Sequence, residues 1–290
     1  MHYLLIVLAS CTSLAEGIII KKYNGKYQSG SFIFTAMISF FSMSFFLLSD
    51  LITDPQKLTF PTELLPYALV AGVWYCAATI LTYIALQIGS FVISLLIISY
   101  SIVFTTAYGI IFLDEPTTLF TWLGFALIAI SLFLLRRKSD ESSEKKKFSF
   151  TWLICIAVSC VGNGAFAIIS RMQQIRFDNG VTNEFMVIAL TLSAVTLGIF
   201  GIVKEKKQAW GSFKTCLPYA IGAGMSNGMT NMMSMFVNTL IPISIAAPTR
   251  SAVKNILSMG VSMAIFKEKF LPRQIVGVVL GAVAVVLLNL

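Results

Sequence analysis

Residues 65–74 read LPYALVAGVW, and residues 217–226 read LPYAIGAGMS, so the same four letters open two apolar segments 152 positions apart. The two segments align without a gap. Recurrence of a segment at a long, fixed separation is the sequence signature of internal duplication. This stretch therefore indicates that the chain consists of two related halves.

Two further matches occur in the same order along the chain. FLDEPTTLFTWLG (112–124) corresponds to IFKEKFLPRQIVG (265–277), which places Glu115 and Gly124 opposite Glu268 and Gly277. More faintly, LASC (8–11) corresponds to AVSC (157–160). The separations drift only between 149 and 153 positions, as insertions in loops between duplicated halves produce.

The composition excludes a soluble enzyme. The chain is 57% hydrophobic and 12% charged, with a mean hydropathy of +0.84. Apolar stretches of about 20 residues, the length that crosses a bilayer as a helix, recur throughout. We predict ten spans, at about 2–21, 31–52, 64–87, 89–113, 117–135, 150–172, 183–203, 213–238, 241–266 and 270–290.

Ten spans give five per half, and an odd number makes the second half cross the membrane in the opposite direction. The sequence thus predicts an all-α membrane protein of ten transmembrane helices in two inverted five-helix repeats. We place the first repeat at 1–138, a charged cytoplasmic linker at 139–147 and the second repeat at 148–290. Inverted repeats are typical of secondary transporters, which bind substrate near the midplane between the halves.

Basic residues predict the orientation. Sixteen Lys and Arg residues lie in loops on one side of the predicted membrane, and only Lys57, Arg171 and Arg176 lie on the other. The positive-inside rule then places RRKSDESSEKKK (136–147) in the cytoplasm and both termini outside. The net charge of +8 is explained by these loops, so it does not indicate nucleic-acid binding.

Residues for catalysis are missing from the spans. The only histidine is His2, no two cysteines have the CxxC spacing, and no GxxxxGK[ST] motif for ATP occurs. We therefore expect no catalytic residue, no metal site and no cofactor, and we expect that the protein is not an enzyme.

Polar residues inside a span are costly, so each needs a partner or a purpose. In the eighth span, Asn227, Asn231, Ser234 and Asn238 follow an i, i+4, i+7, i+11 pattern. At 100° per residue this pattern forms a polar stripe about 60° wide. The stripe suits the wall of a substrate cavity. The alternative is a seam where these side chains hydrogen-bond a neighbouring helix.

The third span has polar residues at positions equivalent to this polar stripe. They are Tyr75, Thr79 and Thr82, and we expect Tyr75 and Thr79 to contact substrate. Trp74 and Tyr83 flank them, and they are suited either to stack on a substrate or to pack between helices.

Two cations lie deep in the ninth span. Arg250 and Lys254 are i, i+4 neighbours, and their repeat counterparts Ile97 and Ser101 are uncharged. A charge at a helix centre costs roughly 2.5–3.5 kcal/mol even on insertion scales. Either these cations pair with buried carboxylates or they bind an anion. Glu16 is the only acidic residue that lies well inside a span. The surplus of positive charge therefore favours an anionic or carboxylate-bearing substrate.

Glu16 occurs in CTSLAEGIIIKK (11–22), inside the first span. It lies about 8 Å from the inner end of that span at 1.5 Å per residue, whereas Lys254 lies about 18 Å from the same face. We therefore expect no tight ion pair unless helix tilt brings the two level. A carboxylate in an apolar setting is suited to exchange protons as access alternates, and the alternative is a structural, cation-paired Glu.

The halves resemble the drug/metabolite transporter superfamily of the EamA type. The resemblance rests on an apolar fourth helix, a short turn with Glu115 or Glu268 and a Gly-bearing fifth helix in each half. LAEGIIIKK (14–22) and LIPISIAAP (240–248), with the last helix, are similar to small multidrug resistance proteins. The resemblance implies a ten-helix transporter. It also implies both termini in the cytoplasm, opposite to the orientation from the charges.

Together these features predict a secondary active transporter in the plasma (inner) membrane. It moves a small polar metabolite, with anionic or carboxylate-bearing substrates favoured, by alternating access with coupling to protons or a counter-substrate. Its expected partners are the substrate and the lipid bilayer; no nucleic acid is expected and no oligomer is required. One alternative is an exporter of lipophilic or quaternary cations. Another is a non-transporting membrane receptor or an enzyme.

Overall fold

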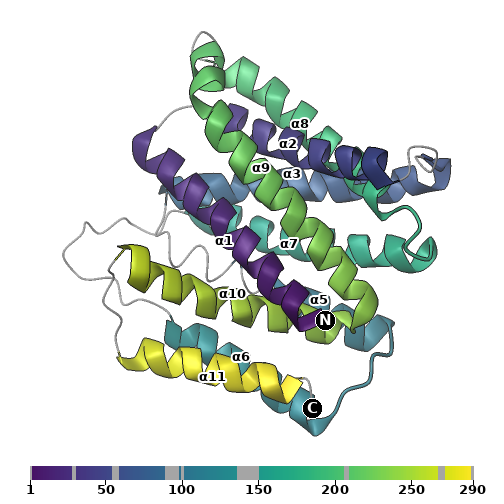
Figure 1. Ribbon diagram of the computed structural model, residues 1–290, viewed down its shortest axis with the longest axis vertical. Helices are drawn as coiled ribbons and strands as arrows, with labels where there is room; N and C mark the ends of the chain where they lie inside the picture. Colours follow the sequence, from purple (N-terminus) through teal and green to yellow (C-terminus); the bar gives the residue numbers. More distant parts are fainter. Residues whose placement is uncertain are drawn as a thin grey trace.

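The computed structural model describes residues 2–27, 31–53, 59–88, 98, 101–135, 150–205, 209–266 and 272–288. Within these ranges the chain forms ten α-helices and a 3-10 turn at Thr62–Leu64 (Figure 1). The helices are α1 His2–Lys26, α2 Ser31–Thr53, α3 Leu65–Ile88, α5 Ile102–Phe112, α6 Leu119–Leu135, α7 Phe150–Arg176, α8 Thr182–Glu205, α9 Ala209–Leu240, α10 Ile243–Phe266 and α11 Pro272–Leu288. The predicted all-α class is confirmed.

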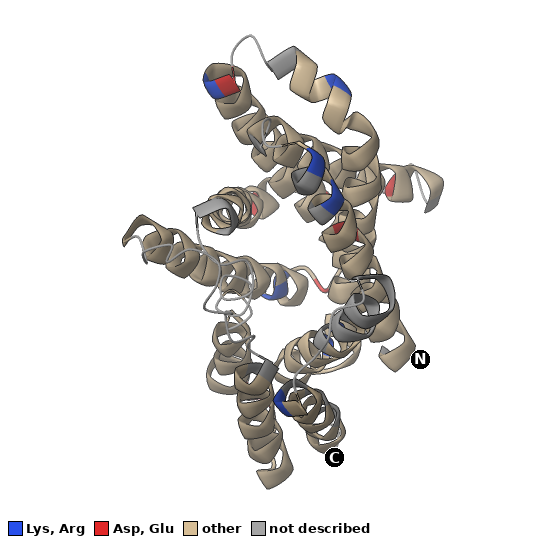
Figure 2. Ribbon diagram, turned by 90° about the vertical axis from the view of Figure 1, so that its left-hand side faces the viewer, with Lys and Arg blue, Asp and Glu red and all other residues tan. Residues whose placement is uncertain are grey.

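Several helices suit a bilayer by length and composition. Among the described residues, α1, α2, α3, α7 and α8 contain apolar windows long enough to cross a membrane, and α5 and α6 are shorter apolar helices. Helices α9 and α10 are long enough, at 32 and 24 residues, but they carry polar residues of the predicted site. Charged residues are sparse along the helices (Figure 2).

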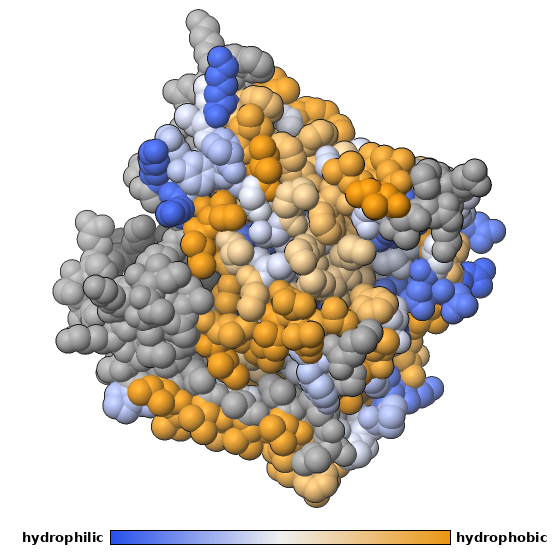
Figure 3. Space-filling view, viewed as in Figure 1, coloured by the Kyte–Doolittle hydropathy of each residue, from blue (hydrophilic) through white to orange (hydrophobic). Residues whose placement is uncertain are grey.

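The outer surface of the bundle is apolar. Ile52 is 83% exposed and Phe150 is 77% exposed, with many other large apolar side chains also exposed. Figure 3 shows such residues spread over one face of the molecule, with hydrophilic residues gathered near its edges. Exposed apolar surface of this extent marks a lipid-facing protein rather than a soluble one. The chain is therefore an integral, multi-pass membrane protein.

Three helix ends lie well beyond the predicted spans: the ends of α1 and α7 and the start of α9. Helix α1 continues to Lys26, five residues beyond the predicted end, because lysines near a helix end extend their charges toward the interface without breaking the helix. Helix α7 likewise continues to Arg176. Much of the predicted fourth span, 89–113, lies outside the described residues, and so does Glu268.

The main contacts between helices recur between their counterparts in the other half of the chain. Helix α3 packs on α7, and their counterparts α9 and α1 pack on each other. In the same way α2 packs on α9 and α8 packs on α3. Helix α2 packs on its own counterpart α8, and α6 packs on α11, at the lower edge of Figure 1. Such pairing is what two halves related by a pseudo-twofold axis produce. The predicted repeat bounds at 138 and 148 lie in the undescribed segment 136–149 and stay a prediction.

Repeat counterparts touch each other at the centre of the bundle. Tyr75 and Asn227, which are 152 positions apart, are joined by a hydrogen bond from the Tyr75 hydroxyl to Asn227 Oδ1 at 3.2 Å. Ser39 and Ser193, which lie in the counterpart helices α2 and α8 close to equivalent positions, have their hydroxyl oxygens 3.2 Å from each other. A residue can contact its own counterpart only close to the symmetry axis, so these two contacts mark where the axis passes.

Each half also supplies an acidic side chain to a helix start of the other half. Glu205, at the end of α8, accepts hydrogen bonds from the backbone N–H groups of Phe32 and Ile33 at 3.0 and 3.3 Å. At the opposite end of the same helix pair, Asp50 near the end of α2 accepts a hydrogen bond at Oδ1 from the side-chain Nδ2 of Asn183, in the first turn of α8. Carboxylates are stabilising at helix N-termini, where backbone N–H groups are unpaired. These contacts fix the antiparallel register of α2 and α8.

We define two faces of the bundle by the chain ends. The terminal face is where α1 begins and α11 ends, at the lower right of Figure 1, and it contains the turns at 113–118, 177–181 and 241–242. The linker face is the opposite one. The turns of the terminal face include Asp114, Asp178 and Asn179 at φ values of 48°, 48° and 60°, a left-handed conformation that Asn and Asp tolerate better than other side chains.

We expect Gly224→Ala to destabilise the bundle, because Gly224 lets α9 lie directly against α2. A Cβ atom there would lie 2.5 Å from Phe41 Cβ and 2.8 Å from the Ile38 carbonyl oxygen. Overpacking of this kind costs about 1–3 kcal/mol. Thermal unfolding of the purified protein should show a clearly lowered Tm. Gly17→Ala on α1 is the matched control, since a Cβ there meets nothing within 4 Å. Equal Tm values for both variants would contradict the close packing.

Candidate functional site

Asn227 is the centre of a polar cluster that joins four helices. Its Nδ2 donates to Glu16 Oε1 at 3.0 Å. Its Oδ1 accepts hydrogen bonds from the Ser42 hydroxyl at 2.9 Å, from Tyr75 at 3.2 Å and from Asn231 Nδ2 at 2.9 Å. The residues come from α1, α2, α3 and α9, so no single segment contains the site. We call these five side chains the Asn227 cluster.

The structure therefore brings together Glu16, Tyr75, Asn227 and Asn231, four of the residues predicted for the site. Each occupies a helix position where apolar residues alone would suffice for packing. Hydrogen bonds between transmembrane helices contribute about 0.6 kcal/mol on average and up to about 1.7 kcal/mol. Three of the cluster's four bonds are of this kind; they hold the helices in register and also fix the direction of the Glu16 carboxylate.

The other residues predicted on α3 make structural contacts. The Thr79 hydroxyl donates to the Tyr75 carbonyl of its own helix at 2.7 Å. Trp74 lies against α7, where a Cβ on Gly162 would be 3.5 Å from the indole. The Tyr75 ring lies 5.1 Å from Phe166, so this side chain combines packing with its hydrogen bond to Asn227. These contacts favour the packing interpretation for Trp74 and for Thr79.

Arg250 and Lys254 lie on α10, beside the Asn227 cluster. The Arg250 Nη1 atom is buried, and it has no hydrogen-bond partner among the described residues. Lys254 interacts electrostatically with Glu16 and with Arg250, but its ammonium group is not within ion-pair distance of Glu16 in the described structure. The Lys254 side chain is exposed although it lies mid-helix. A cation at this depth is stable only where water or an anion can reach it.

The position of Glu16 corrects the expectation drawn from span ends. Because α1 ends at Lys26, Glu16 lies ten residues from the end of its helix, and Lys254 lies twelve residues from the end of α10 at Phe266. At 1.5 Å per residue both groups are about 15–18 Å from the ends of their helices. Helices α1 and α10 pack on each other. Ile6 of α1 and Ala246 of α10 share a small apolar cluster with Val237 of α9. Glu16 and Lys254 therefore lie at similar depths, which explains their electrostatic interaction.

The polar stripe of α9 is divided between two environments. Asn227 and Asn231 belong to the Asn227 cluster, and Ser234 is half-buried further along the helix. Asn238 lies one turn from the end of α9 and lines a pocket of about 500 Å³ at the terminal face. Asn238 is the one member of the polar stripe that lines this pocket, whose other polar members are Glu115, Arg171 and Thr239.

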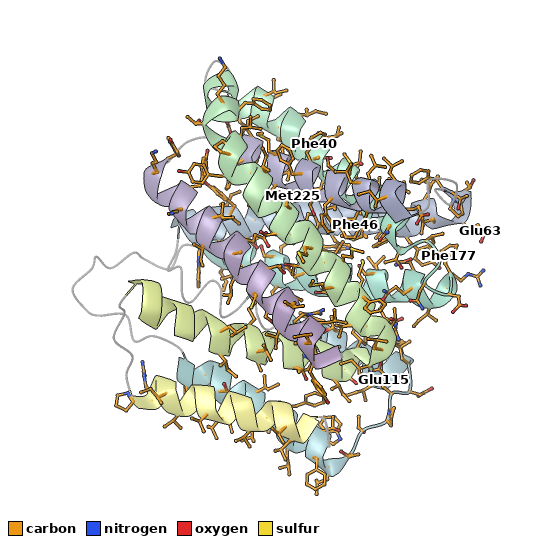
Figure 4. All side chains as sticks on the ribbon, viewed as in Figure 1. Phe40, Phe46, Glu63, Glu115, Phe177 and Met225 are labelled. Carbon is orange, nitrogen blue, oxygen red and sulfur yellow. The ribbon has the colours of Figure 1, made fainter. Side chains whose placement is uncertain are left out.

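Glu115 connects the α5–α6 turn of the first half to α10 of the second half. Its two carboxylate oxygens accept hydrogen bonds from the backbone N–H groups of Ile243 and Ser244, each at 2.9 Å. Figure 4 shows Glu115 where the lower end of α9 meets α10. These N–H groups belong to the first turn of α10, whose helix dipole favours a negative charge. The short Glu-containing turn of the first half is thus a helix cap supplied across the two halves.

Sequence reasoning missed Ser42 as a member of the site and did not connect Arg171 with Asn238. Ser42 lies in FFSMSFF (40–46), where a hydroxyl interrupts an aromatic run. That interruption was an available signal, although serines in a membrane helix often bond their own backbone, as Ser44 does to Phe40. For Arg171 the signal was a charge at the end of a span, which side-chain extension to the interface also explains.

Comparison with known proteins finds one family match and a similar solved structure. No curated protein matches it. A solved structure described only as the crystal structure of a protein is similar over 99% of this chain and 94% of that chain, with a TM-score of 0.71 and 12% sequence identity, a likeness that shows the fold. Residues 1–137 match the model of the EamA-like transporter family, which suggests a membrane transporter of the drug/metabolite type. The match covers the N-terminal half of the chain, which is therefore similar to EamA-like transporters.

Proposed function

We propose that this protein is a secondary transporter, rather than an enzyme, that moves a small carboxylate-bearing metabolite across the plasma (inner) membrane. The substrate's negative charge binds at Arg250 and Lys254, next to the Asn227 cluster. Alternating access exposes this position to each side in turn, and Glu16 couples the cycle to protons. One observation carries this proposal: Arg250 Nη1 is buried without a hydrogen-bond partner among the described residues.

The charges around this position do not balance. Glu16 is the acidic group that acts on Lys254, and one of its oxygens is already bonded to Asn227. Arg250 and Lys254 repel each other, and burial of an unpaired guanidinium is costly. A bound carboxylate offers two acceptor oxygens to this pair of cations, and charge-assisted bonds are roughly twice as strong as neutral ones. An anionic ligand therefore supplies what the fold leaves unsatisfied.

The pseudo-twofold arrangement supports alternating access. When two inverted halves exchange conformations, contacts on the axis are kept and contacts away from it are exchanged. Tyr75–Asn227 and Ser39–Ser193 are on the axis and would persist as a pivot. The Glu115 cap of α10 lies at the terminal face, away from the axis, so we expect it to break when that face opens.

In the proposed cycle, Glu16 links protons to substrate. Its carboxylate and a bound anion compete for Lys254, since both are attracted to the same cation. Protonation of Glu16 thereby favours binding of the substrate anion, and binding of the anion favours protonation of Glu16. This is the linkage that a proton-coupled transporter requires. The Asn227 hydrogen bond keeps Glu16 directed into the cluster through the cycle.

The runner-up function is export of lipophilic or quaternary cations, in which Glu16 itself binds the ligand. The single observation in its favour is a carboxylate buried in the bundle and held by Asn227. Arg250 and Lys254 oppose it, since two cations within electrostatic reach repel a cationic ligand. A non-transporting receptor or enzyme has no specific observation in its favour.

A ligand screen by thermal shift tests the proposal. The panel contains small carboxylates, their isosteric neutral amides, phosphorylated metabolites and quaternary ammonium ions. We expect carboxylates to raise the Tm and their amides to leave it unchanged; a ligand at a hundred times its Kd stabilises by about 2.7 kcal/mol. The stabilisation should shrink in Lys254→Gln and persist in Lys204→Gln, a control that removes an exposed lysine at the end of α8. Stabilisation by the quaternary ions alone would establish the runner-up instead.

A further inference from the structure

The pocket at the terminal face lies away from the Asn227 cluster and has a volume of about 500 Å³. Small-molecule sites typically enclose about 300–1,000 Å³ and combine apolar walls with a few convergent polar groups. Its walls include Leu113, Ile175 and Ile241, from the α5–α6 turn, α7 and the α9–α10 turn. The first and second halves of the chain therefore both contribute to it.

Two polar groups of this pocket are buried without hydrogen bonds. Asn238 is only 6% exposed, and its Oδ1 has no partner among the described residues. The Nε atom of Arg171 is likewise buried and unpartnered in the described structure. Leaving such groups unsatisfied costs about 1–3 kcal/mol each, more when charged, so native proteins rarely do so without a reason. Both residues belong to the lining of the same cavity.

Glu115 does not satisfy the Arg171 Nε–H, although the two residues attract each other electrostatically. Both oxygens of Glu115 are bonded to the first backbone N–H groups of α10 at 2.9 Å. The N-terminus of α10 and the guanidinium together offset the Glu115 charge, which leaves room for a second anion beside Arg171. Thr239 is also occupied, because its hydroxyl donates to the Phe236 carbonyl at 2.7 Å.

We propose that this pocket is a second ligand site, separate from the one at Lys254, that binds a small apolar-bodied carboxylate carrying one O–H or N–H donor. The carboxylate accepts from Arg171, the donor group bonds Asn238 Oδ1, and the apolar body lies against Leu113, Ile175 and Ile241. The binding site stands on these contacts alone; the further step, that its occupant is a substrate entering or leaving by the terminal face, rests on the proposed function.

Matched ligands test this assignment by calorimetry on the purified protein. The probes are 2-hydroxy-4-methylpentanoate, which has a carboxylate and a hydroxyl donor, and 4-methylpentanoate, which lacks the donor. Leucine, with an ammonium donor, distinguishes amino from hydroxy acids. Measurements in the Lys254→Gln variant report this pocket with the central site impaired. We expect the hydroxy acid to bind about tenfold or more tightly than 4-methylpentanoate, a difference of one good buried hydrogen bond.

Two substitutions in this background separate the roles of the pocket residues. Asn238→Leu should bring both affinities to the same value while the Tm stays equal or rises, because an unpaired buried acceptor is replaced by an apolar group of similar size. Arg171→Gln should weaken both acids by about thirtyfold or more, as loss of a buried charge partner typically does. Arg171→Lys keeps the charge, so it supplies a folded variant if Arg171→Gln is unstable, and it should weaken both acids by about tenfold.

Three results would overturn the assignment. They are no binding of either acid at about 10 mM, a hydroxyl preference that survives Asn238→Leu, or unchanged affinity in a folded Arg171 variant. Each result concerns binding in the Lys254→Gln background, so it leaves the proposed transport function untouched. Conversely, failure of carboxylates to stabilise the wild-type protein through Lys254 would contradict the proposed function while this pocket still bound its probes.

Discussion

Lys254→Gln should reduce transport of a carboxylate substrate by about thirtyfold or more, whereas Glu16→Gln should keep substrate binding measurable and remove the pH dependence of transport. A substrate bound at Lys254 shields the ammonium group from water, and loss of a charge-assisted contact buried in this way typically costs about 2–5 kcal/mol, which gives the first effect. Gln at position 16 retains an oxygen to accept from Asn227 Nδ2, so the Asn227 cluster stays bonded. Uptake by reconstituted vesicles at several pH values, together with equilibrium binding, measures both effects.

The controls for this pair come from the chain itself. Lys204→Gln removes an exposed lysine near the linker face, where its ammonium lies over Phe32, and it should leave transport unchanged. A cation exporter would reverse the ranking: Glu16→Gln would abolish binding, and Lys254→Gln would be neutral or favourable because a repulsive charge is lost. Equal, complete loss with poor expression in both variants would mean that the two groups form a structural network.

Asn227→Leu should lower the stability of the folded protein much more than Asn231→Leu does. Asn227 makes four side-chain hydrogen bonds to α1, α2, α3 and its own helix, whereas Asn231 donates one bond to it. At about 0.6 kcal/mol for each of the three bonds to other helices, and up to about 1.7 kcal/mol each, the loss at Asn227 amounts to about 2–5 kcal/mol. Thermal unfolding in detergent, read by intrinsic tryptophan fluorescence, compares the two variants.

Asn231→Leu is both the control for position on α9 and the test of a substrate role. It should unfold close to the wild-type Tm yet bind the substrate more weakly, because Asn231 belongs to the polar stripe predicted to contact substrate and contributes only one of the cluster's bonds. If Asn231→Leu lowered the Tm as far as Asn227→Leu and left affinity unchanged, the polar stripe would be a seam between helices and the cavity interpretation would fail.

Much of the fold follows from local properties of the sequence. Apolar length predicts each span without reference to its neighbours, so nine predicted spans agree with described helices within several residues, and α5 covers part of the fourth. The largest deviations, at the ends of α1 and α7, occur where basic side chains let a helix continue past the last apolar residue. The internal repeat also predicted which helices are counterparts, and contacts between helices recur between their counterparts.

The candidate site followed only partly from the sequence. Spacing on α9 identified Asn227 and Asn231, and the cost of buried charge identified Glu16, Arg250 and Lys254. Periodicity predicted Thr79 and Tyr75 equally as substrate contacts. The Thr79 hydroxyl instead donates to a backbone carbonyl of its own helix, whereas the Tyr75 hydroxyl donates to Asn227. One face of a helix contains both side chains, and only the neighbouring helices determine which of them meets a partner.

What the sequence determined by itself is the class of the molecule: a membrane protein of duplicated apolar helices with a carboxylate and two cations inside them. Only the tertiary structure decided that Glu16, Ser42, Tyr75 and Asn231 meet at Asn227, and that Arg171 and Asn238 line one pocket. The physical reason is that spanning a bilayer depends on the hydrophobicity summed along one segment, which is local. Contacts between segments depend on the tilt, rotation and depth of each helix, and these are set jointly by all the helices that pack around it.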